Sequence, residues 1–562
     1  ELHKKYNHIQ EVIVQNFKAK PNTLMVNAAE PSFDELMWTI AMARLILPGD
    51  ISLQVPPNLN SEHINQLTLS GINDFGGISP VTKDYVNPEA PWPEIEKLTK
   101  IALKTNQILK PRATLYPKYF SNFETFSTPK ISAKLLQITD SQSLIRSDQW
   151  KSGVSKNIPA YPEAIFNSNI RSLIKDVEKN PSIKNVQSLL EVSDNDFKYI
   201  VEYADDVKSK IHGSDISFVV NRNINYTNIC SFKCNFCAFS KGRGHDDLRG
   251  EPYNISAEEI IRRTNEAIDR GATEVCLQGG IHPKYSGETY LDIVRAIRSV
   301  SNTIHIHAFS PLEIDHGRKT LNVSVKEFLT ELKKAGLNSL PGTAAEILHD
   351  DIRSIICPDK LNSNEWVEII KSAHSIGLPT TSTMMFGHVE NMFHVAHHLI
   401  KLLDIQNSTN GITEFVPLPF VADEAPIFRR GKSRPGPTFK ETILVHSVAR
   451  ILFNGTINNI QGSWVKMGLP GLKYLLSSGI NDIGGVLMNE SITRSAGASF
   501  GQELNLDDVL CIADELGLNL KQRNTLYEPL NNNLQDLINL QSIPLIPIIN
   551  DYHQPKKINN TL

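Results

Sequence analysis

The 562-residue chain lacks an uninterrupted apolar run long enough to cross a bilayer, and it has no long basic segment. The first absence excludes a membrane-spanning helix, and the second argues against nucleic acid as a partner. Lys and Arg number 57 against 61 Asp and Glu, so the net charge is only −4. With 40% hydrophobic residues, the composition is typical of a soluble globular protein, and the length predicts two or three domains.

Cysteine is scarce, with six residues in the whole chain and none in residues 1–125. So few cysteines exclude a disulfide framework. Half of them nevertheless lie within eight residues, as Cys230, Cys234 and Cys237. Clustered thiolates need a reducing compartment, so we expect a cytoplasmic protein.

The spacing CxxxCxxC is one ligand short of a closed site. Structural zinc sites use four protein ligands, and a closed four-iron cluster uses four cysteines. Three cysteines on one loop therefore favour a [4Fe–4S] cluster with one open iron, and the pattern resembles that of radical S-adenosylmethionine (SAM) enzymes. Zinc completed by a distant ligand is the alternative, although Cys276, Cys357 and Cys511 are isolated in apolar segments.

An internal repeat is the second strong feature, with copies about 400 residues apart. Residues 70–77 (SGINDFGG) recur as residues 478–485 (SGINDIGG). Three further matches keep this order: residues 11–17 with 414–420, 43–47 with 449–453, and 112–116 with 523–527. The chain therefore contains two copies of one module, and the first copy is represented only by its last third. The chain begins at Glu1 rather than Met, and we expect a piece of a longer protein.

Strands and helices alternate throughout the second copy. A β-rich segment at residues 216–225 runs into the cysteine loop, helical spacing follows at 257–270, and 274–280 is a buried strand closed by two glycines. About eight such strands predict an α/β fold with a (β/α)8 TIM-type barrel. By the repeat, the first copy would supply about three β/α units of a second, partial barrel.

These patterns predict four regions. Residues 1–127 hold the partial barrel without a cluster loop. Residues 128–185 are rich in Ser, Asn, Lys and Pro and are expected to be a linker. Residues 186–530 hold the complete barrel, entered by a helical pair near 186–211. Residues 531–562 are rich in Asn, Gln and Pro and are expected to be a poorly ordered tail.

Several longer motifs resemble one enzyme family. The cysteine loop in residues 220–239 is similar to that of FO synthase, which makes a 5-deazaflavin chromophore. Further matches are QGGIHP at 278–283, HIHAFSPLE at 305–313 and LPGTAAEIL at 340–348. Residues 186–530 look like the 4-hydroxyphenyl transferase half of this fused enzyme. Residues 9–120 resemble the C-terminal part of its lyase half, so the resemblance implies a truncated N-terminal half or a chain in which only the transferase half is active.

The resemblance implies an activity, cofactors and partners. The enzyme would use a [4Fe–4S] cluster and SAM to break L-tyrosine and couple its 4-hydroxybenzyl fragment to 5-amino-6-(D-ribitylamino)uracil. A reductant protein would supply the cluster with electrons, and the ring-closing lyase half is incomplete in this chain. A related menaquinone-pathway radical SAM enzyme, or a non-catalytic iron–sulfur or zinc protein, remains the alternative.

Cofactor residues are predicted first. Cys230, Cys234 and Cys237 would ligate iron. Gly279 and Gly280 end the second strand and, lacking a Cβ, would let the backbone approach SAM. A simple strand-to-loop turn would explain the two glycines equally well.

Substrate residues are predicted from strand positions. His305 and His307 lie two apart on a strand and so share one face, where they would bond substrate or move protons near pH 7, or would be core histidines. Glu346 and Glu414 lie near strand ends and Glu490 follows the eighth strand, so each is a candidate catalytic residue or a cap. Arg494 is a candidate partner for a substrate carboxylate. Because Asn73 and Asp74 recur as Asn481 and Asp482, we predict a structural role for both pairs.

Overall fold

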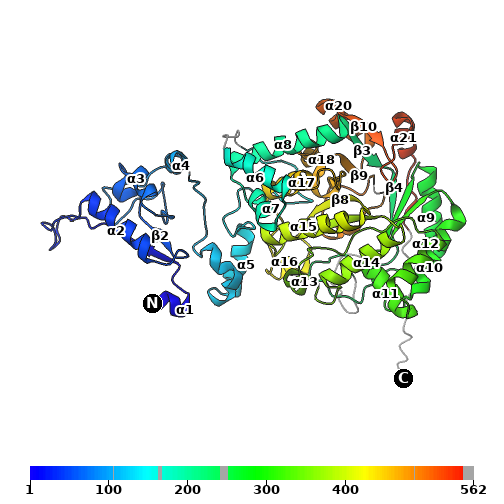
Figure 1. Ribbon diagram of the computed structural model, residues 1–562, viewed down its shortest axis with the longest axis horizontal. Helices are drawn as coiled ribbons and strands as arrows, with labels where there is room; N and C mark the ends of the chain where they lie inside the picture. The colour runs from blue at the N-terminus through cyan, green and yellow to red at the C-terminus, as the bar shows by residue number, and fades with distance from the viewer. Residues whose placement is uncertain (106, 162–167, 241–250, 487, 549–562) are drawn as a thin grey trace, which may run out of the picture. The chain divides into compact units, whose positions relative to one another are not determined.

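The computed structural model describes residues 1–105, 107–161, 168–240, 251–486 and 488–548. It divides into two compact units (Figure 1). The first comprises Glu1–Phe123 with Ser143–Ile145, and the second comprises Glu124–Gln142 with Arg146–Leu562. Only the second contains the three clustered cysteines.

A ring of parallel strands forms the centre of the second unit. Its first segment is β3 (Asp215–Val219) continued by β4 (Asn221–Asn225). β4 pairs in parallel with β5 (Glu274–Gln278), which pairs in parallel with β6 (His305–Ala308). β3 also pairs with the late strand β10 (Asn519–Gln522), which the sequence did not lead us to expect.

Parallel bridges complete the ring. His307 bridges to residue 339, and residue 340 bridges to β7 (Thr380–Phe386), which pairs with β8 (Ile412–Pro419). β8 bridges to residue 460, residue 461 bridges to β9 (Asp482–Gly485), and β9 returns to β3. Eight parallel segments therefore close the barrel that the alternation predicted. β7 is buried along almost its whole length, as expected for a parallel strand covered on both faces.

Helices surround these strands (Figure 1). Many begin at a Ser, Thr or Asn cap with Glu three residues later, as at Ser324 with Glu327 and Thr438 with Glu441, which satisfies otherwise unpaired backbone N–H groups. The main helices are α9 (Ala257–Asp269), α10 (Gly287–Val300), α11 (Pro311–Leu321), α12 (Val325–Ala335), α13 (Asp350–Ile356), α14 (Ser363–Ser375), α15 (Met392–Thr409), α17 (Phe439–Leu452), α18 (Trp464–Leu476) and α20 (Leu506–Leu516). Two short helices are α16 (Pro426–Arg429) and α19 (Ile492–Ser495).

The chain enters the barrel through the predicted helical pair, α7 (Ile183–Leu190) and α8 (Asp194–His212). The segment before it, expected to be a linker, contains α5 (Pro129–Ile138) and α6 (Ser168–Lys179), and its described residues belong to the second unit except for Ser143–Ile145. The Arg146 guanidinium donates to the carbonyls of Gly436 and Pro437 at 2.8 and 3.1 Å. Contacts of this kind hold the segment in place without a repeating pattern of apolar residues. Its composition alone therefore led to the prediction of a linker.

The C-terminal region also differs from expectation where it is described. Helix α21 (Leu534–Gln541) begins at the cap Asn533, and Leu537 on it is buried. The backbone N–H of Ile546 donates to Glu266 on α9. The described part of the expected tail is therefore packed, and the rest of that prediction, at residues 549–562, lies outside the described residues.

The first unit contains three parallel backbone segments. β1 (Glu11–Ile13) pairs with β2 (Ser52–Gln54), and Gln54 bridges in parallel to Asp74. Its helices are α1 (Leu2–Tyr6), α2 (Phe33–Ile46), α3 (Ile64–Leu69) and α4 (Ile95–Lys104), with 3-10 turns η1 (Asn58–Asn60) and η2 (Pro117–Thr125). That these segments belong to a second barrel stays a prediction.

Matching hydrogen bonds confirm the repeat inside each unit. In the first, Arg112 donates through Nε and Nη2 to the Asp74 carboxylate, and Tyr116 donates to Glu11. In the second, the same atoms of Arg523 donate to Asp482, and Tyr527 donates to Glu414. Each guanidinium carbon lies 3.9 Å from the centre of its tyrosine ring. We call each set of four residues (Glu, Asp, Arg and Tyr) a floor quartet.

The repeated asparagines also have matching partners. Asn73 Oδ1 accepts hydrogen bonds from Arg44 and from the backbone of Leu53. Asn481 Oδ1 accepts from Arg450 and from the backbone of Ile460 in the same way. The predicted structural role of these pairs is therefore what their contacts indicate.

Candidate active site

A cavity of about 420 Å³ opens inside the barrel of the second unit. Strands and the loops that follow them around the ring contribute to its walls. Nine predicted site residues line it: Cys230, Cys234, Cys237, Gly279, Gly280, His307, Glu346, Glu414 and Glu490. His305 is predicted with them but does not line the cavity. The carboxyl ends of parallel barrel strands are where active sites gather, so this cavity is the candidate active site.

The three cysteines are half-buried free thiols on the loop that follows β4. The backbone N–H of Ile281 donates to Cys230 Sγ at 3.3 Å, and the Cys237 N–H donates to the Cys234 carbonyl at 3.2 Å. On the same loop, the Asn235 N–H donates to the Ile356 carbonyl, and the Asn235 side-chain oxygen accepts from Arg430. The loop is therefore held at Cys230 and at Asn235, and its thiols lie at the cavity wall.

These thiols fit an iron–sulfur cluster by donor type. Burial raises the pKa of Cys234 to about 12, so that thiol keeps its proton until a metal displaces it. Among the described residues, no three His, Cys, Asp or Glu side chains lie where they could hold a single metal ion. A cluster instead takes each cysteine on a separate iron. A backbone N–H donor to one sulfur is also the kind of contact that tunes such clusters.

Gly279 and Gly280 allow the strand end to pass directly beneath this loop. A Cβ on Gly279 would lie 2.3 Å from the Tyr226 ring, and one on Gly280 would lie 2.3 Å from the carbonyl oxygen of Ile229. The backbone of β5 therefore approaches both the loop and the cavity more closely than any other residue type permits. Close packing explains both glycines, and contact with SAM stays a prediction.

Replacing Gly280 by Ala is expected to push the loop away and weaken iron binding by roughly 10-fold or more, since supporting residues have effects of that size. Iron and sulfide per chain after anaerobic reconstitution measure this effect. Gly49→Ala is the control, because nothing lies within 4 Å of the added Cβ there. Equal iron content in both variants would contradict the expectation.

Glu313 is a buried carboxylate that sequence reasoning missed. It accepts hydrogen bonds from Tyr226 Oη, from the Gly279 N–H and from both the N–H and hydroxyl of Ser310. Burial raises the pKa of Glu313, and these donors oppose that rise. The spacing of Ser310 and Glu313 is typical of a helix start, and α11 does begin there. The spacing carries no sign that Glu313 also binds the backbone at the end of β5.

Lys360 is a second residue that the sequence did not single out. Its ammonium pairs with Glu346 at 2.8 Å and lies 5.1 Å from the centre of the Phe236 ring on the cysteine loop. Burial lowers the pKa of Lys360, but Cys234 and Glu346 outweigh it and raise the value. Glu346 has a left-handed backbone (φ 47°), a conformation that is often found at functional sites. A positive charge thus lies beside the cluster loop.

The two histidines share one face of β6, as predicted. His305 and His307 contact the same hydroxyl, that of Ser339, at 2.6 and 2.7 Å. Burial lowers the pKa of His305 to about 4 and that of His307 to about 3, so both are neutral near pH 7. The position of His305 matches the core-histidine alternative. His307 lines the cavity as a neutral hydrogen-bonding group, which disfavours proton exchange near pH 7.

Glu414 belongs to the floor quartet of the second unit. Arg523 lies 3.3 Å from Glu414 and binds Asp482 at 2.5 Å, while Tyr527 donates to Glu414. Burial raises the pKa of Glu414, and Arg523 opposes that rise. Because Glu414 and Arg523 also line the cavity, the carboxylate is both a structural partner and accessible to a bound molecule.

The loop after β9 brings Glu490 to the cavity but leaves Arg494 outside. Glu490 is buried and its Oε1 accepts the Thr493 N–H at 2.7 Å. Arg494 is exposed and does not line the cavity, so its predicted role toward a substrate carboxylate lacks support. Arg494 follows Glu490 by four residues. Unlike Arg494, the cationic side chain of Lys466 on α18 does line the cavity.

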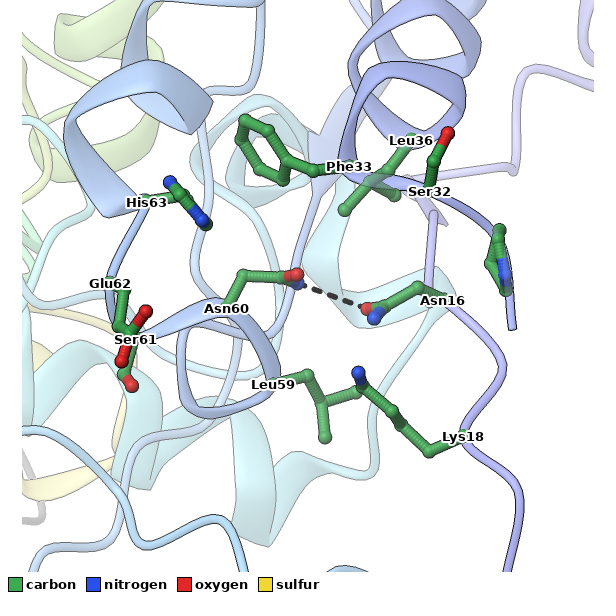
Figure 2. A pocket seen from close by; sticks show the side chains of 11 residues that line it. Asn16, Lys18, Ser32, Phe33, Leu36, Leu59, Asn60, Ser61, Glu62 and His63 are labelled. Carbon is green, nitrogen blue, oxygen red and sulfur yellow. Dashed lines mark hydrogen bonds between the residues drawn. The ribbon is translucent and has the colours of Figure 1, made fainter. Parts of the chain in front are cut away.

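A second cavity, of about 320 Å³, lies within the first unit. Figure 2 shows Asn60 donating to Asn16 across it at 3.0 Å, near Ser32 and Phe33 at the start of α2. Ser32 and Phe33 correspond in the repeat to Thr438 and Phe439. In the second unit, Trp150 packs edge-on against Phe439. The position of this cavity therefore corresponds to a place that Trp150 occupies in the second unit, and the cavity is not a counterpart of the one lined by the cysteines.

A closed β/α barrel with three loop cysteines at its cavity defines the radical SAM class. The description "Radical SAM superfamily" matches residues 224–402, and "CofH/MqnC C-terminal region" matches residues 409–535. Membership of this class implies an iron–sulfur cluster and SAM.

Within this class, the chain belongs to the FO synthase family. It is 38% identical to FO synthase of Nocardia farcinica (strain IFM 10152), covering 93% of this chain and 67% of that protein. It is 37% identical to FO synthase of Mycobacterium leprae (strain TN), covering 93% of this chain and 66% of that protein. The chain thus spans about two thirds of these relatives.

A shorter relative covers less of this chain. The 5-amino-6-(D-ribitylamino)uracil–L-tyrosine 4-hydroxyphenyl transferase of Methanopyrus kandleri is 47% identical over 59% of this chain and 88% of its own length. A solved structure, the hydrogenase maturase HydG from Carboxydothermus hydrogenoformans, is similar at TM-score 0.49 and 14% identity, covering 64% of this chain and 80% of that one. Across the described ranges, no helix combines the length and apolar character needed to span a bilayer.

Proposed function

We propose that the second unit is a radical SAM transferase that couples the 4-hydroxybenzyl fragment of L-tyrosine to 5-amino-6-(D-ribitylamino)uracil. The observation that carries the proposal is the convergence, on one barrel cavity, of three cysteines, a glycine strand end and buried polar side chains. The names of the transferase and FO synthase relatives supply the substrate class.

In this proposal, Cys230, Cys234 and Cys237 hold a [4Fe–4S] cluster, and the Gly279–Gly280 backbone borders SAM. When bound, these cofactors supply a 5′-deoxyadenosyl radical. The protein contributes ligation, orientation and exclusion of water. Glu313 fixes the Gly279 N–H, so the strand end that borders SAM keeps one position. Neutral His307 offers a hydrogen bond inside the barrel without adding charge.

The first unit is proposed to be the C-terminal part of the lyase half. Its floor quartet, built around Arg112, supports this assignment because two members of the matching quartet, Glu414 and Arg523, line the cavity of the second unit. Glu11 and Arg112 would then face the cavity of the complete lyase barrel. A reductant protein is the proposed source of electrons for the cluster.

An anaerobic assay with SAM, a reductant, L-tyrosine and the ribitylaminouracil tests the proposal. We expect SAM cleavage together with a tyrosine-derived adduct of the uracil, detected by mass spectrometry. SAM cleavage without that adduct would contradict the proposal and favour a related pathway enzyme. One zinc per chain without sulfide, after anaerobic reconstitution, would favour the non-catalytic alternative.

A further inference from the structure

Two oppositely charged side chains at the cavity lack an ion-pair partner within the described part of the chain. Glu490 is 4% exposed, and its Oε2 has no hydrogen-bond partner among the described residues. Its other oxygen is occupied by the Thr493 N–H. Lys466 forms no ion pair with any residue of the described ranges, although it lines the same cavity. A buried carboxylate oxygen without a partner is costly, and the half-buried Lys466 brings an unpaired positive charge to the same cavity, so a ligand is the expected partner for both.

The fold brings these groups together on one side of the barrel. Lys466 lies near the start of α18, just after the seventh strand segment at residues 460–461, and Glu490 follows the eighth. The two side chains are close enough for the charge of Glu490 to raise the pKa of Lys466, which burial lowers to about 8. They do not form an ion pair with each other, so both charges remain available to a ligand.

This side of the barrel adjoins the cysteine loop. Met488, two residues before Glu490, bridges to Arg222 on β4, and β4 leads directly into the loop. The backbone of Lys466 is fixed as well, because its carbonyl accepts the Gly153 N–H at 2.6 Å. A molecule held by Glu490 and Lys466 would therefore occupy the same cavity that the three cysteines line.

We propose that Glu490 and Lys466 bind the α-ammonium and α-carboxylate groups of L-tyrosine, as an amino-acid clamp. The proposal rests on the proposed function. L-tyrosine carries one positive and one negative group on the same carbon, which complements the pair of side chains. The ribitylaminouracil offers neutral amide, amino and hydroxyl groups and would leave both charges without a counter-charge. The methionyl end of SAM has the same zwitterionic chemistry, so the experiment must separate these two sources.

Glu490→Gln and Lys466→Met test the clamp, because each keeps the shape of the side chain and removes its charge. Each is expected to raise the KM for L-tyrosine at least about 10-fold, the loss expected for a charged hydrogen bond, while the KM values for SAM and the uracil stay unchanged. Equilibrium dialysis of labelled L-tyrosine against the cluster-free protein gives a second readout and should show the same loss of affinity.

Analogues assign each residue to one group of the ligand. Wild type should discriminate against tyramine, which lacks the carboxylate, and against 3-(4-hydroxyphenyl)propionate, which lacks the amine. Lys466→Met should lose the first discrimination and Glu490→Gln the second. Lys473→Met on the same helix and Glu515→Gln are matched controls, since these residues pair with each other and lie outside the cavity.

The outcomes separate this inference from the proposed function. If wild type forms no tyrosine–uracil adduct, the proposed function fails, whatever the variants do. If wild type forms it but the variants keep the KM for L-tyrosine, or change only that for SAM or the uracil, the clamp is wrong. Iron content and circular dichroism equal to wild type establish that the variants are folded.

Discussion

Replacing Cys234 by Ala is expected to abolish SAM cleavage and to remove the characteristic iron–sulfur absorbance after anaerobic reconstitution. The three cysteines share one loop at the cavity, and no further cysteine lies on that loop. Losing one thiolate leaves two protein ligands for the cluster. The measurements are iron and sulfide per chain, visible absorbance and 5′-deoxyadenosine formation. Cys230→Ala and Cys237→Ala should behave alike.

Cys511→Ala is the matched control for this prediction. Cys511 is an exposed thiol on α20 and does not line the cavity. Its removal should leave iron, sulfide and SAM cleavage at the wild-type level. A Cys234→Ala protein that keeps both its cluster and SAM cleavage would show that the loop is not the cluster site.

Replacing Arg523 by Met is expected to lower the free energy of unfolding of the second unit by about 3–5 kcal/mol. The Arg523 side chain is 6% exposed and neutralises Asp482 and Glu414 at once. Without Arg523, the buried carboxylates of Asp482 and Glu414 have no cationic partner. The unpaired negative charge is what destabilises the folded unit. The urea midpoint measures the loss, with the buried side chains Trp366 and Trp464 as fluorescence reporters.

The repeat provides the control for this prediction. Arg112→Met removes the same contacts from the floor quartet of the first unit, where the arginine is 20% exposed. Because water can solvate the remaining carboxylates there, we expect a smaller loss of stability, and none in the signal from Trp366. Equal effects of both substitutions would contradict the burial argument.

Local sequence patterns were sufficient for the barrel. Helical periodicity, Ser or Thr caps and glycine pairs fall near the observed element boundaries, as at α9, α12 and β5. They were not sufficient for residues 128–185, where single contacts such as Arg146 with Gly436 provide the anchorage. Such contacts join residues about 290 positions apart, and neither composition nor periodicity carries a signal for them.

The residues of the site also fall into those that a local pattern predicts and those that only the fold brings together. The spacing of Cys230, Cys234 and Cys237 is a short-range pattern imposed by one cofactor, so it was readable directly. Lys360 has no motif, because its significance comes only from folding against Glu346 and the cysteine loop. His305 and His307 looked equivalent on their strand, yet only His307 lines the cavity.

The sequence by itself determined the cysteine loop, the alternation of strands and helices, and the existence of two copies of one module. These features are local or repeated, so each can be recognised without knowing what lies beside it. Only the tertiary structure decided that the repeat preserves the floor quartet, that Arg494 lies outside the cavity, and that Glu490 and Lys466 line it without an ion-pair partner among the described residues. Those facts depend on which groups closure of the barrel brings together and removes from water, and no single stretch of sequence contains that information.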